Sequence, residues 1–331
     1  MKLNGKNISE VFNQNFKWVK IFIMVAAYGY LIYTFATFKY YNEFSQYFAT
    51  SGAEGIKYLF FCLLLIPLNW LLESAKWQEV LSKIQNLSLS QAVKSVLIGL
   101  TSGFFTPNRV GEPVGRAMLL ADGNKTKGVF CSLICTLAQS FATLFFACIA
   151  CAIVGDFALA TEHTEGLSVI RNLGIAGVIA VCLLYFTIPF WVGKLKLKSE
   201  KLQDIARAIS LISYGSLLKV SLYSILRFAV YSFQYYLMLR FFAVDITLPE
   251  ALIFIPINYL LVSVIPSVAF AEMGIRGTSA VLVLSAVTQN TLGVALAAVG
   301  VWFLNYVIPM LVGSLLLMKQ ERNEKNTDTL G

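Results

Sequence analysis

Long apolar stretches alternate with short polar segments along the chain. A helix needs about 20 apolar residues to cross the ~30 Å hydrocarbon core of a bilayer. Five stretches are close to that length or longer and a sixth is shorter: Ile21–Phe38, Phe130–Val154, Gly174–Trp191, Val220–Phe242, Leu292–Leu317 and Tyr58–Leu72. We therefore predict about six transmembrane helices.

Two further regions begin apolar, break at Pro and Gly, and return to the side from which they started. Proline lacks an amide N–H and glycine is conformationally permissive, so both interrupt helices. We predict two membrane hairpins, re-entrant or fully spanning, over 89–121 and 250–288. The residues expected at their breaks are Pro107, Gly111, Pro113, Pro266 and Gly274.

The order of these elements repeats. Residues of about 20–154 read span, span, hairpin, span, and residues 172–318 give the same order with each element crossing in the opposite sense. Inverted repeats of this kind are typical of transporters, whose substrate sites lie near mid-membrane. The predicted fold is an all-α polytopic membrane protein. Residues 1–331 form one integral membrane domain with a cytoplasmic linker, 194–215, and a cytoplasmic tail, 319–331.

Composition and charge agree with this fold and orient it. Apolar residues make up 57% of the chain and charged residues 13%, against roughly 45–50% and 25% in soluble proteins. Lys and Arg collect in cytoplasmic loops. With both termini cytoplasmic, the inner segments hold 18 Lys and Arg and the outer segments hold four. We expect a multi-pass protein of the cell inner membrane, anchored by an uncleaved first span.

Six ionisable residues remain at membrane depth: Arg109, Glu112, Arg116, Arg227, Glu272 and Arg276. One Arg at the centre of a membrane helix costs roughly 2.5–3.5 kcal/mol, so four exposed to lipid would cost about 10–14 kcal/mol. These side chains must therefore face a protein interior or a wet cavity. In helical segments, Glu112 and Arg116 share one face, as do Glu272 and Arg276.

Two interpretations of this set stay open. The six residues are either structural ion pairs that hold the hairpins to the bundle, or the lining of an anion site. Two carboxylates leave four guanidiniums with a net charge of +2, and the planar fork of Arg suits phosphate. A lipid phosphate would fit such a site.

Sequence motifs give no support for catalysis. The chain has no HExxH, no P-loop and no Gly-x-Ser-x-Gly, which are motifs for metalloprotease, nucleotide and hydrolase chemistry. The single histidine, His163, and the six cysteines lack metal-ligand spacing. We expect no enzyme activity, no catalytic residue, no metal, no cofactor and no nucleic-acid partner.

The segment Pro107-Asn108-Arg109-Val110-Gly111-Glu112, followed by Arg116, resembles the transmembrane region of the lysylphosphatidylglycerol synthase family, also called flippase-like. That family has a Pro-x-Arg-x-Gly-Glu element and a second Pro/Gly-rich hairpin, here Pro266 to Gly277. Arg116 falls one residue later than the common spacing, and Gly277 stands where many members have Glu. The resemblance covers roughly 15–320. Members with synthase activity carry a large cytoplasmic domain after the membrane part, and only about a dozen polar residues follow the last span here.

The resemblance implies translocation or handling of a phospholipid or a polyprenyl-phosphate lipid. The leading hypothesis is a lipid flippase-like transporter with an arginine-lined mid-membrane site. The main alternative is a non-transporting membrane scaffold, a partner of a lipid- or glycan-pathway enzyme, and a weaker one is an intramembrane transferase. An anionic lipid and the membrane are the expected partners, and a homo-oligomer is compatible with the sequence.

Overall fold

A computed structural model describes residues 42, 45–46, 52–104, 106–159, 165–194, 203, 206, 210, 212–265 and 269–328. The chain divides into two compact units, Met1–Ser45 and Gln46–Gly331. All the elements below belong to the second unit. The predicted span Ile21–Phe38 and the break residue Pro266 lie outside the described residues.

Every regular element in the described part of the chain is a helix. The helices are α3 (Gly52–Leu81), α4 (Leu89–Phe104), α5 (Gly111–Ala117), α6 (Lys125–Leu159), α7 (Glu165–Phe186), α8 (Ile188–Lys194), α10 (Tyr214–Phe241), α11 (Leu248–Val264), α12 (Ala269–Leu284), α13 (Thr291–Trp302) and α14 (Ile308–Asp328), with short turns η1 (Pro107–Arg109), η2 (Asp122–Asn124) and η3 (Phe303–Val307).

Four helical stretches in the described residues are long and apolar enough to cross a membrane. They are Gly55–Leu81, Asp122–Val154, Ser168–Phe186 and Thr291–Lys319. The protein is therefore an all-helical, multi-pass membrane protein. Helix α10 is also long, with 28 residues, but Lys219, Arg227 and Arg240 make it less apolar.

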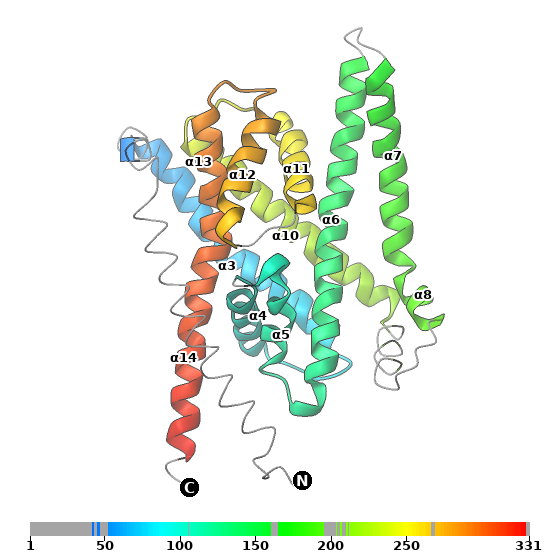
Figure 1. Ribbon diagram of the computed structural model, residues 1–331, viewed down its shortest axis with the longest axis vertical. Helices are drawn as coiled ribbons and strands as arrows, with labels where there is room; N and C mark the ends of the chain where they lie inside the picture. The colour runs from blue at the N-terminus through cyan, green and yellow to red at the C-terminus, as the bar shows by residue number, and fades with distance from the viewer. Residues whose placement is uncertain are drawn as a thin grey trace, which may run out of the picture. The chain divides into compact units, whose positions relative to one another are not determined.

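Two pairs of short helices, at the positions of the predicted hairpins, lie between α6 and the α13–α14 stretch, with α4–α5 below α11–α12 in the view of Figure 1. Their arms have 16, 7, 17 and 16 residues, all short of the ~20 residues that span a bilayer. In the described residues, α4 packs on α5 and α11 packs on α12. An ion pair between Arg109, just before α5, and Glu272, in the first turn of α12, joins the two helix pairs.

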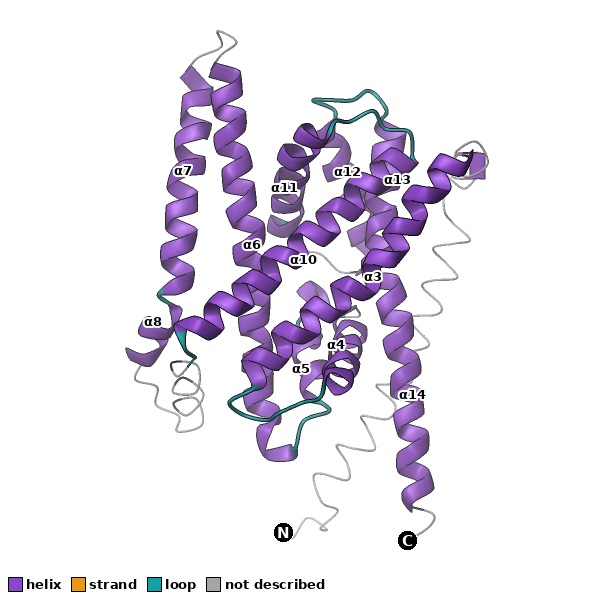
Figure 2. Cartoon of the chain, turned by 180° about the vertical axis from the view of Figure 1, so that it is seen from behind, coloured by secondary structure: helices purple, strands orange, loops and turns teal. Residues whose placement is uncertain are grey.

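Helices α3 and α10 lie side by side and cross α6 and α14 obliquely (Figure 2). Local sequence fixes where several helices begin. Ser213 caps α10 by accepting from the Ser216 amide, and Thr247 with Glu250 forms a capping box at the start of α11, satisfying amides that have no partner within the helix.

Helix α3 corrects the predicted end of the second span. We expected that span to stop at Leu72 and residues 73–94 to face the cytoplasm, but α3 runs on to Leu81 with Glu73, Lys76 and Trp77 buried. Lys76 was counted among the loop cations, yet it pairs with Glu73 inside the protein. The two charges compensate each other, so a charged stretch of sequence remains part of a buried helix.

Candidate functional site

A cavity of about 390 Å³ lies where the two hairpin ends meet the long helices. Its charged lining consists of three guanidiniums and one carboxylate, those of Arg109, Arg227, Arg276 and Glu272. Four of the six ionisable residues predicted for the site therefore share one cavity. Glu112 and Arg116 do not line it.

The end of the first hairpin holds Arg109 in a strained backbone turn. Asn108 and Arg109 have φ values of 47° and 59°, in the left-handed region that residues other than glycine seldom adopt. The Gly111 amide donates to Thr106 Oγ1 at 2.8 Å, which closes the turn. Strain of this kind persists only when the surroundings enforce it, and it is concentrated at functional sites.

Glu272, on α12, contacts two arginines and a tryptophan at this end of the cavity. Its Oε2 accepts from Arg109 Nη2 at 2.9 Å and from Trp302 Nε1 at 2.9 Å, and Arg276 Nε lies 3.5 Å from the same oxygen. Arg109 and Arg276 also stack over the Tyr306 ring, with Cζ atoms 3.5 Å and 4.9 Å from its centroid. One carboxylate and one aromatic ring thus hold two guanidiniums in place.

Tyr306 reaches the cavity from a π-helical turn, η3, which interrupts the last long helix. Pro309 follows four residues after Asn305 and has no N–H to donate to the Asn305 carbonyl. The helix widens there, and Asn305 and Tyr306 both line the cavity. Single π turns inside α-helices often occur at functional sites.

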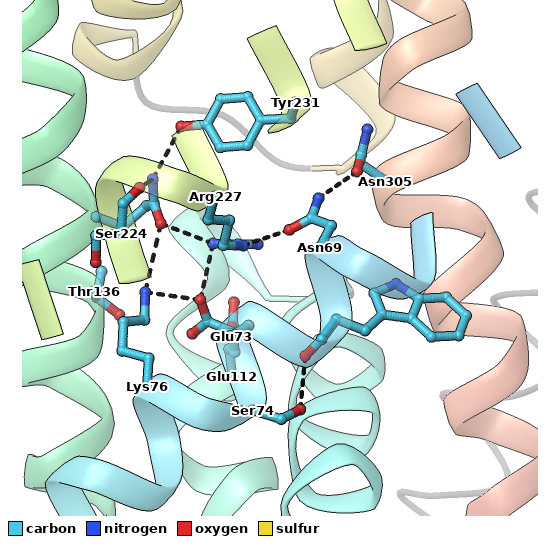
Figure 3. Close-up of polar contacts among 12 residues, drawn as sticks. Asn69, Glu73, Ser74, Lys76, Glu112, Thr136, Ser224, Arg227, Tyr231 and Asn305 are labelled. Atoms are coloured by element: carbon cyan, nitrogen blue, oxygen red, sulfur yellow. Dashed lines mark hydrogen bonds and ion pairs between the residues drawn. The ribbon is translucent and has the colours of Figure 1, made fainter. Parts of the chain in front are cut away.

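Arg227, on α10, is held by amide side chains from two other helices, α3 and α6. Its Nε donates to Asn69 Oδ1 at 2.6 Å and its Nη1 to Gln139 Oε1 at 3.2 Å. Asn69 in turn donates to Asn305 Oδ1 at 2.6 Å. Figure 3 shows this network converging on the guanidinium. Gln139 and Asn305 thus form hydrogen bonds between helices.

Behind Arg227 lies a buried group of five residues, which we call the Glu73 cluster. Glu73 forms ion pairs with Lys76 Nζ at 2.7 Å, Arg116 Nη1 at 2.7 Å and Arg227 Nη1 at 3.0 Å. Glu112 completes the cluster by pairing with Arg116. The Glu73 and Arg116 side chains are each only 3% exposed, so the cluster is a dry ion-paired core next to the cavity.

Sequence reasoning missed Glu73 and Lys76. The pair follows directly on an apolar run at a spacing of three residues, which places both side chains on one helix face. That spacing is the signal that would have extended the span beyond Leu72.

The residues expected at the hairpin breaks behave differently from one another. Gly111 begins α5 just after the left-handed turn, and Pro113 is buried in the first turn of α5, where proline is tolerated. Gly274 lies inside α12, so it does not interrupt a helix. Pro107 is the first residue of the η1 turn. Among the described residues, no group of three or more His, Cys, Asp or Glu side chains could hold a metal ion.

Comparison with known families agrees with this architecture. The family model described as the lysylphosphatidylglycerol synthase TM region matches residues 18–313. The match includes both hairpins and every charged residue of the cavity. A search of curated proteins gives no match.

Proposed function

The chain belongs to the family of the lysylphosphatidylglycerol synthase transmembrane region, and on that premise we propose that it binds and translocates an anionic lipid, a phospholipid or a polyprenyl-phosphate lipid. The lipid phosphate occupies the cavity between the hairpins. The protein acts as a flippase-like transporter and not as an enzyme. It resides in the inner membrane with both termini cytoplasmic.

The observation that carries this proposal is the excess of positive charge on the cavity lining. Three guanidiniums face one carboxylate there. Two unit charges about 4 Å apart interact by roughly 4 kcal/mol at an effective dielectric constant of ~20, so a phosphate in this cavity gains substantial stabilisation. Arg109, Arg227 and Arg276 supply planar donors that match phosphate oxygens. Glu272 orients two of them, and Glu112 and Arg116 support the first hairpin from behind.

An apolar side of the cavity supports a lipid over a free anion. Val262, Val264 and Ile265, at the end of α11, line the same cavity as the guanidiniums. Val264 is 70% exposed. An acyl or prenyl chain can lie along these residues while the phosphate remains among the arginines.

The arrangement of the hairpins supports the inverted-repeat hypothesis. One hairpin comes from each proposed half, 20–154 and 172–318, and the two contact each other through Arg109 and Glu272. Repeats of opposite topology place a substrate site at their interface. Alternate access would then require the two halves to move about this contact.

A second candidate function, a non-transporting scaffold, draws support from the Glu73 cluster. Its three cations and two carboxylates are paired with one another in the core. A scaffold that binds a lipid- or glycan-pathway enzyme would need such a rigid core. It would not need the net charge of +2 that the cluster and the cavity lining carry together, so we place transport first.

Lysine substitution in reconstituted vesicles tests the proposal. Arg109→Lys and Arg276→Lys keep the charge but lose the planar fork, so we expect each to lower translocation of a fluorescent phosphatidylglycerol by about tenfold or more. Arg240→Lys is the matched control, because Arg240 pairs with exposed Asp245 away from the cavity. Full activity of both cavity variants, or no translocation by the parent protein, would favour the scaffold.

A further inference from the structure

The described lining of the cavity has no unshared carboxylate with which a positively charged group could pair. Among the described residues that line it, Glu272 is the only carboxylate, and its Oε2 already accepts from Arg109 and Trp302. Glu73 lies behind the lining and is shared by three cations. An ammonium group in the cavity would therefore meet an excess of guanidinium charge with no carboxylate to pair with.

The part of the cavity lined by α6, α10 and Tyr259 of α11 is polar and uncharged apart from Arg227. Hydroxyl groups of Thr143, Tyr231 and Tyr259 line it. Gln139 Nε2 donates to the Tyr231 hydroxyl at 3.1 Å, and the Thr143 hydroxyl lies 3.5 Å from the same oxygen. The Tyr259 hydroxyl donates to the Tyr231 carbonyl at 3.3 Å. Each hydroxyl is a donor with two acceptor lone pairs, so this side retains capacity to bond a ligand hydroxyl.

We infer that the ligand is a lipid with one phosphate and an uncharged, hydroxyl-bearing headgroup such as glycerol or a sugar. A lipid whose headgroup bears ammonium groups is discriminated against. This inference rests on the proposed function, because it takes the phosphate to lie among Arg109, Arg227 and Arg276. The headgroup then extends toward Thr143 and Tyr231.

The consequence concerns the lipid after which the family is named. Lysylphosphatidylglycerol carries two ammonium groups on its lysyl ester, and these outweigh its phosphate. Phosphatidylglycerol lacks them and presents two hydroxyls instead. The geometry therefore favours phosphatidylglycerol or a neutral glycolipid phosphate over the aminoacylated lipid.

Lipid competition on the full chain in nanodiscs tests this discrimination. The probes are phosphatidylglycerol, phosphatidic acid and lysylphosphatidylglycerol with identical acyl chains, with phosphatidylcholine as the bulk lipid and native mass spectrometry as the readout. We expect phosphatidylglycerol to be retained about tenfold more than lysylphosphatidylglycerol, and more than phosphatidic acid, which has no headgroup hydroxyl. Free glycerol phosphate is expected not to displace it, because the soluble anion lacks the chain that contacts Val262 and Val264.

Two variants assign the discrimination to named residues. Tyr231→Phe removes one hydroxyl and should abolish the preference over phosphatidic acid while leaving the binding of phosphatidic acid intact. Arg276→Gln removes one positive charge and should narrow the gap between phosphatidylglycerol and lysylphosphatidylglycerol. Arg240→Gln removes the same charge from a half-buried position at the end of α10, away from the cavity, and should change neither ratio.

The failures of the two proposals are distinguishable. Equal retention of phosphatidylglycerol and lysylphosphatidylglycerol, both above phosphatidylcholine, overturns the headgroup inference and leaves the phosphate site standing. Equal retention of phosphatidylglycerol and phosphatidic acid overturns the role of the hydroxyl-lined side. Retention of no anionic lipid above phosphatidylcholine overturns the proposed function itself, and displacement by free glycerol phosphate overturns the choice of a lipid.

Discussion

Glu73 is the residue on which most of the buried charge depends. It forms ion pairs with Lys76, Arg116 and Arg227 at distances of 2.7–3.0 Å, and it is almost inaccessible to solvent. The Arg227 guanidinium keeps its position in the cavity because Glu73 and Asn69 hold it from behind. Glu73 therefore controls the shape of the site without lining it.

Replacing Glu73 tests this dependence. Glu73→Gln removes the shared charge and leaves three buried cations, so we expect a loss of roughly 3–5 kcal/mol in the free energy of unfolding, as for other broken buried ion pairs. The measurement is the unfolding transition of the purified protein in detergent. Glu79→Gln, one and a half turns later on α3, is the control, because Glu79 pairs with exposed Lys219. Similar transitions for both variants would show that the cluster is not a stabilising core.

Individual residues differ in how far the sequence predicted them. Four of the six ionisable residues singled out in the sequence line the cavity: Arg109, Arg227, Glu272 and Arg276. They stood out because a charged residue in an apolar segment is costly unless it has a partner or a wet surrounding. Arg116 belongs to the same class by sequence, but it pairs with Glu73 and Glu112 outside the cavity. Charge and hydropathy alone do not distinguish a residue in a buried ion pair from one that lines a cavity. In both environments an arginine avoids the free-energy cost of contact with lipid.

At the scale of elements, the two hairpins do not depend equally on glycine. A Cβ atom on Gly111 would lie 2.5 Å from the Ser102 carbonyl oxygen and 2.9 Å from Thr106 Cγ2. A Cβ on Gly274 would meet nothing within 4 Å. The first hairpin therefore requires glycine at position 111, because the backbone there approaches the Ser102 carbonyl closely. At Gly274 there is room for a larger side chain.

Alanine substitutions at Gly111 and Gly274 should have different effects on stability. Gly111→Ala forces the hairpin end apart, and we expect a loss of about 1–3 kcal/mol in unfolding free energy, as for other overpacked sites, with weaker lipid retention because Arg109 moves. Gly274→Ala lies within helix α12 and should be neutral or stabilising by up to about 1 kcal/mol. Thermal unfolding and lipid retention of the two purified variants give the comparison. Equal losses at both positions would contradict it.

The sequence predicts the end of a helix best where Pro or Gly interrupts it. Pro107 and Gly111 lie between the end of α4 and the body of α5, as expected. The end of α3 was placed nine residues early, because Glu73 and Lys76 resemble a loop until their mutual pairing is known. The π-helical turn at Phe303–Val307 was not predicted. The only signal for this turn in the sequence is the four-residue spacing of Asn305 and Pro309. A proline in a helix can end it, kink it or widen one turn, so the spacing does not identify a π turn.

At the scale of the whole molecule, the proposed orientation makes two exposed loops face opposite sides of the membrane. The α10–α11 loop and the start of α6 lie at opposite ends of the helices in Figure 1. Asp245 and Asp122 are exposed in these loops. Only the excess of Lys and Arg in the inner segments says which of the two is cytoplasmic.

Cysteine labelling in intact cells checks the orientation. A membrane-impermeant maleimide should label Asp245→Cys directly and Asp122→Cys only after permeabilisation. The parent protein, whose six cysteines lie in apolar segments, sets the background. The reverse pattern would invert the topology and place both termini outside.

The sequence predicted the all-helical membrane architecture, since the apolar length of the segments determines it. It did not predict how α3 and α10 cross the other helices. That crossing brings Asn69, Glu73 and Arg227 together over 158 residues of sequence separation. Contacts of this kind depend on packing between distant segments, which hydropathy does not encode.

The pairing of Glu73 with Lys76 also bears on how the chain is made. Glu73 and Lys76 precede both Arg116 and Arg227 in the chain. A lone charge entering the bilayer costs roughly 2.5–3.5 kcal/mol, but Lys76 lies on the same helix, 2.7 Å from the Glu73 carboxylate. Helix α3 thus enters the membrane with its own counter-ion. The two arginines join the carboxylate as the later helices arrive, so the first element of the cluster also serves as the template for its assembly.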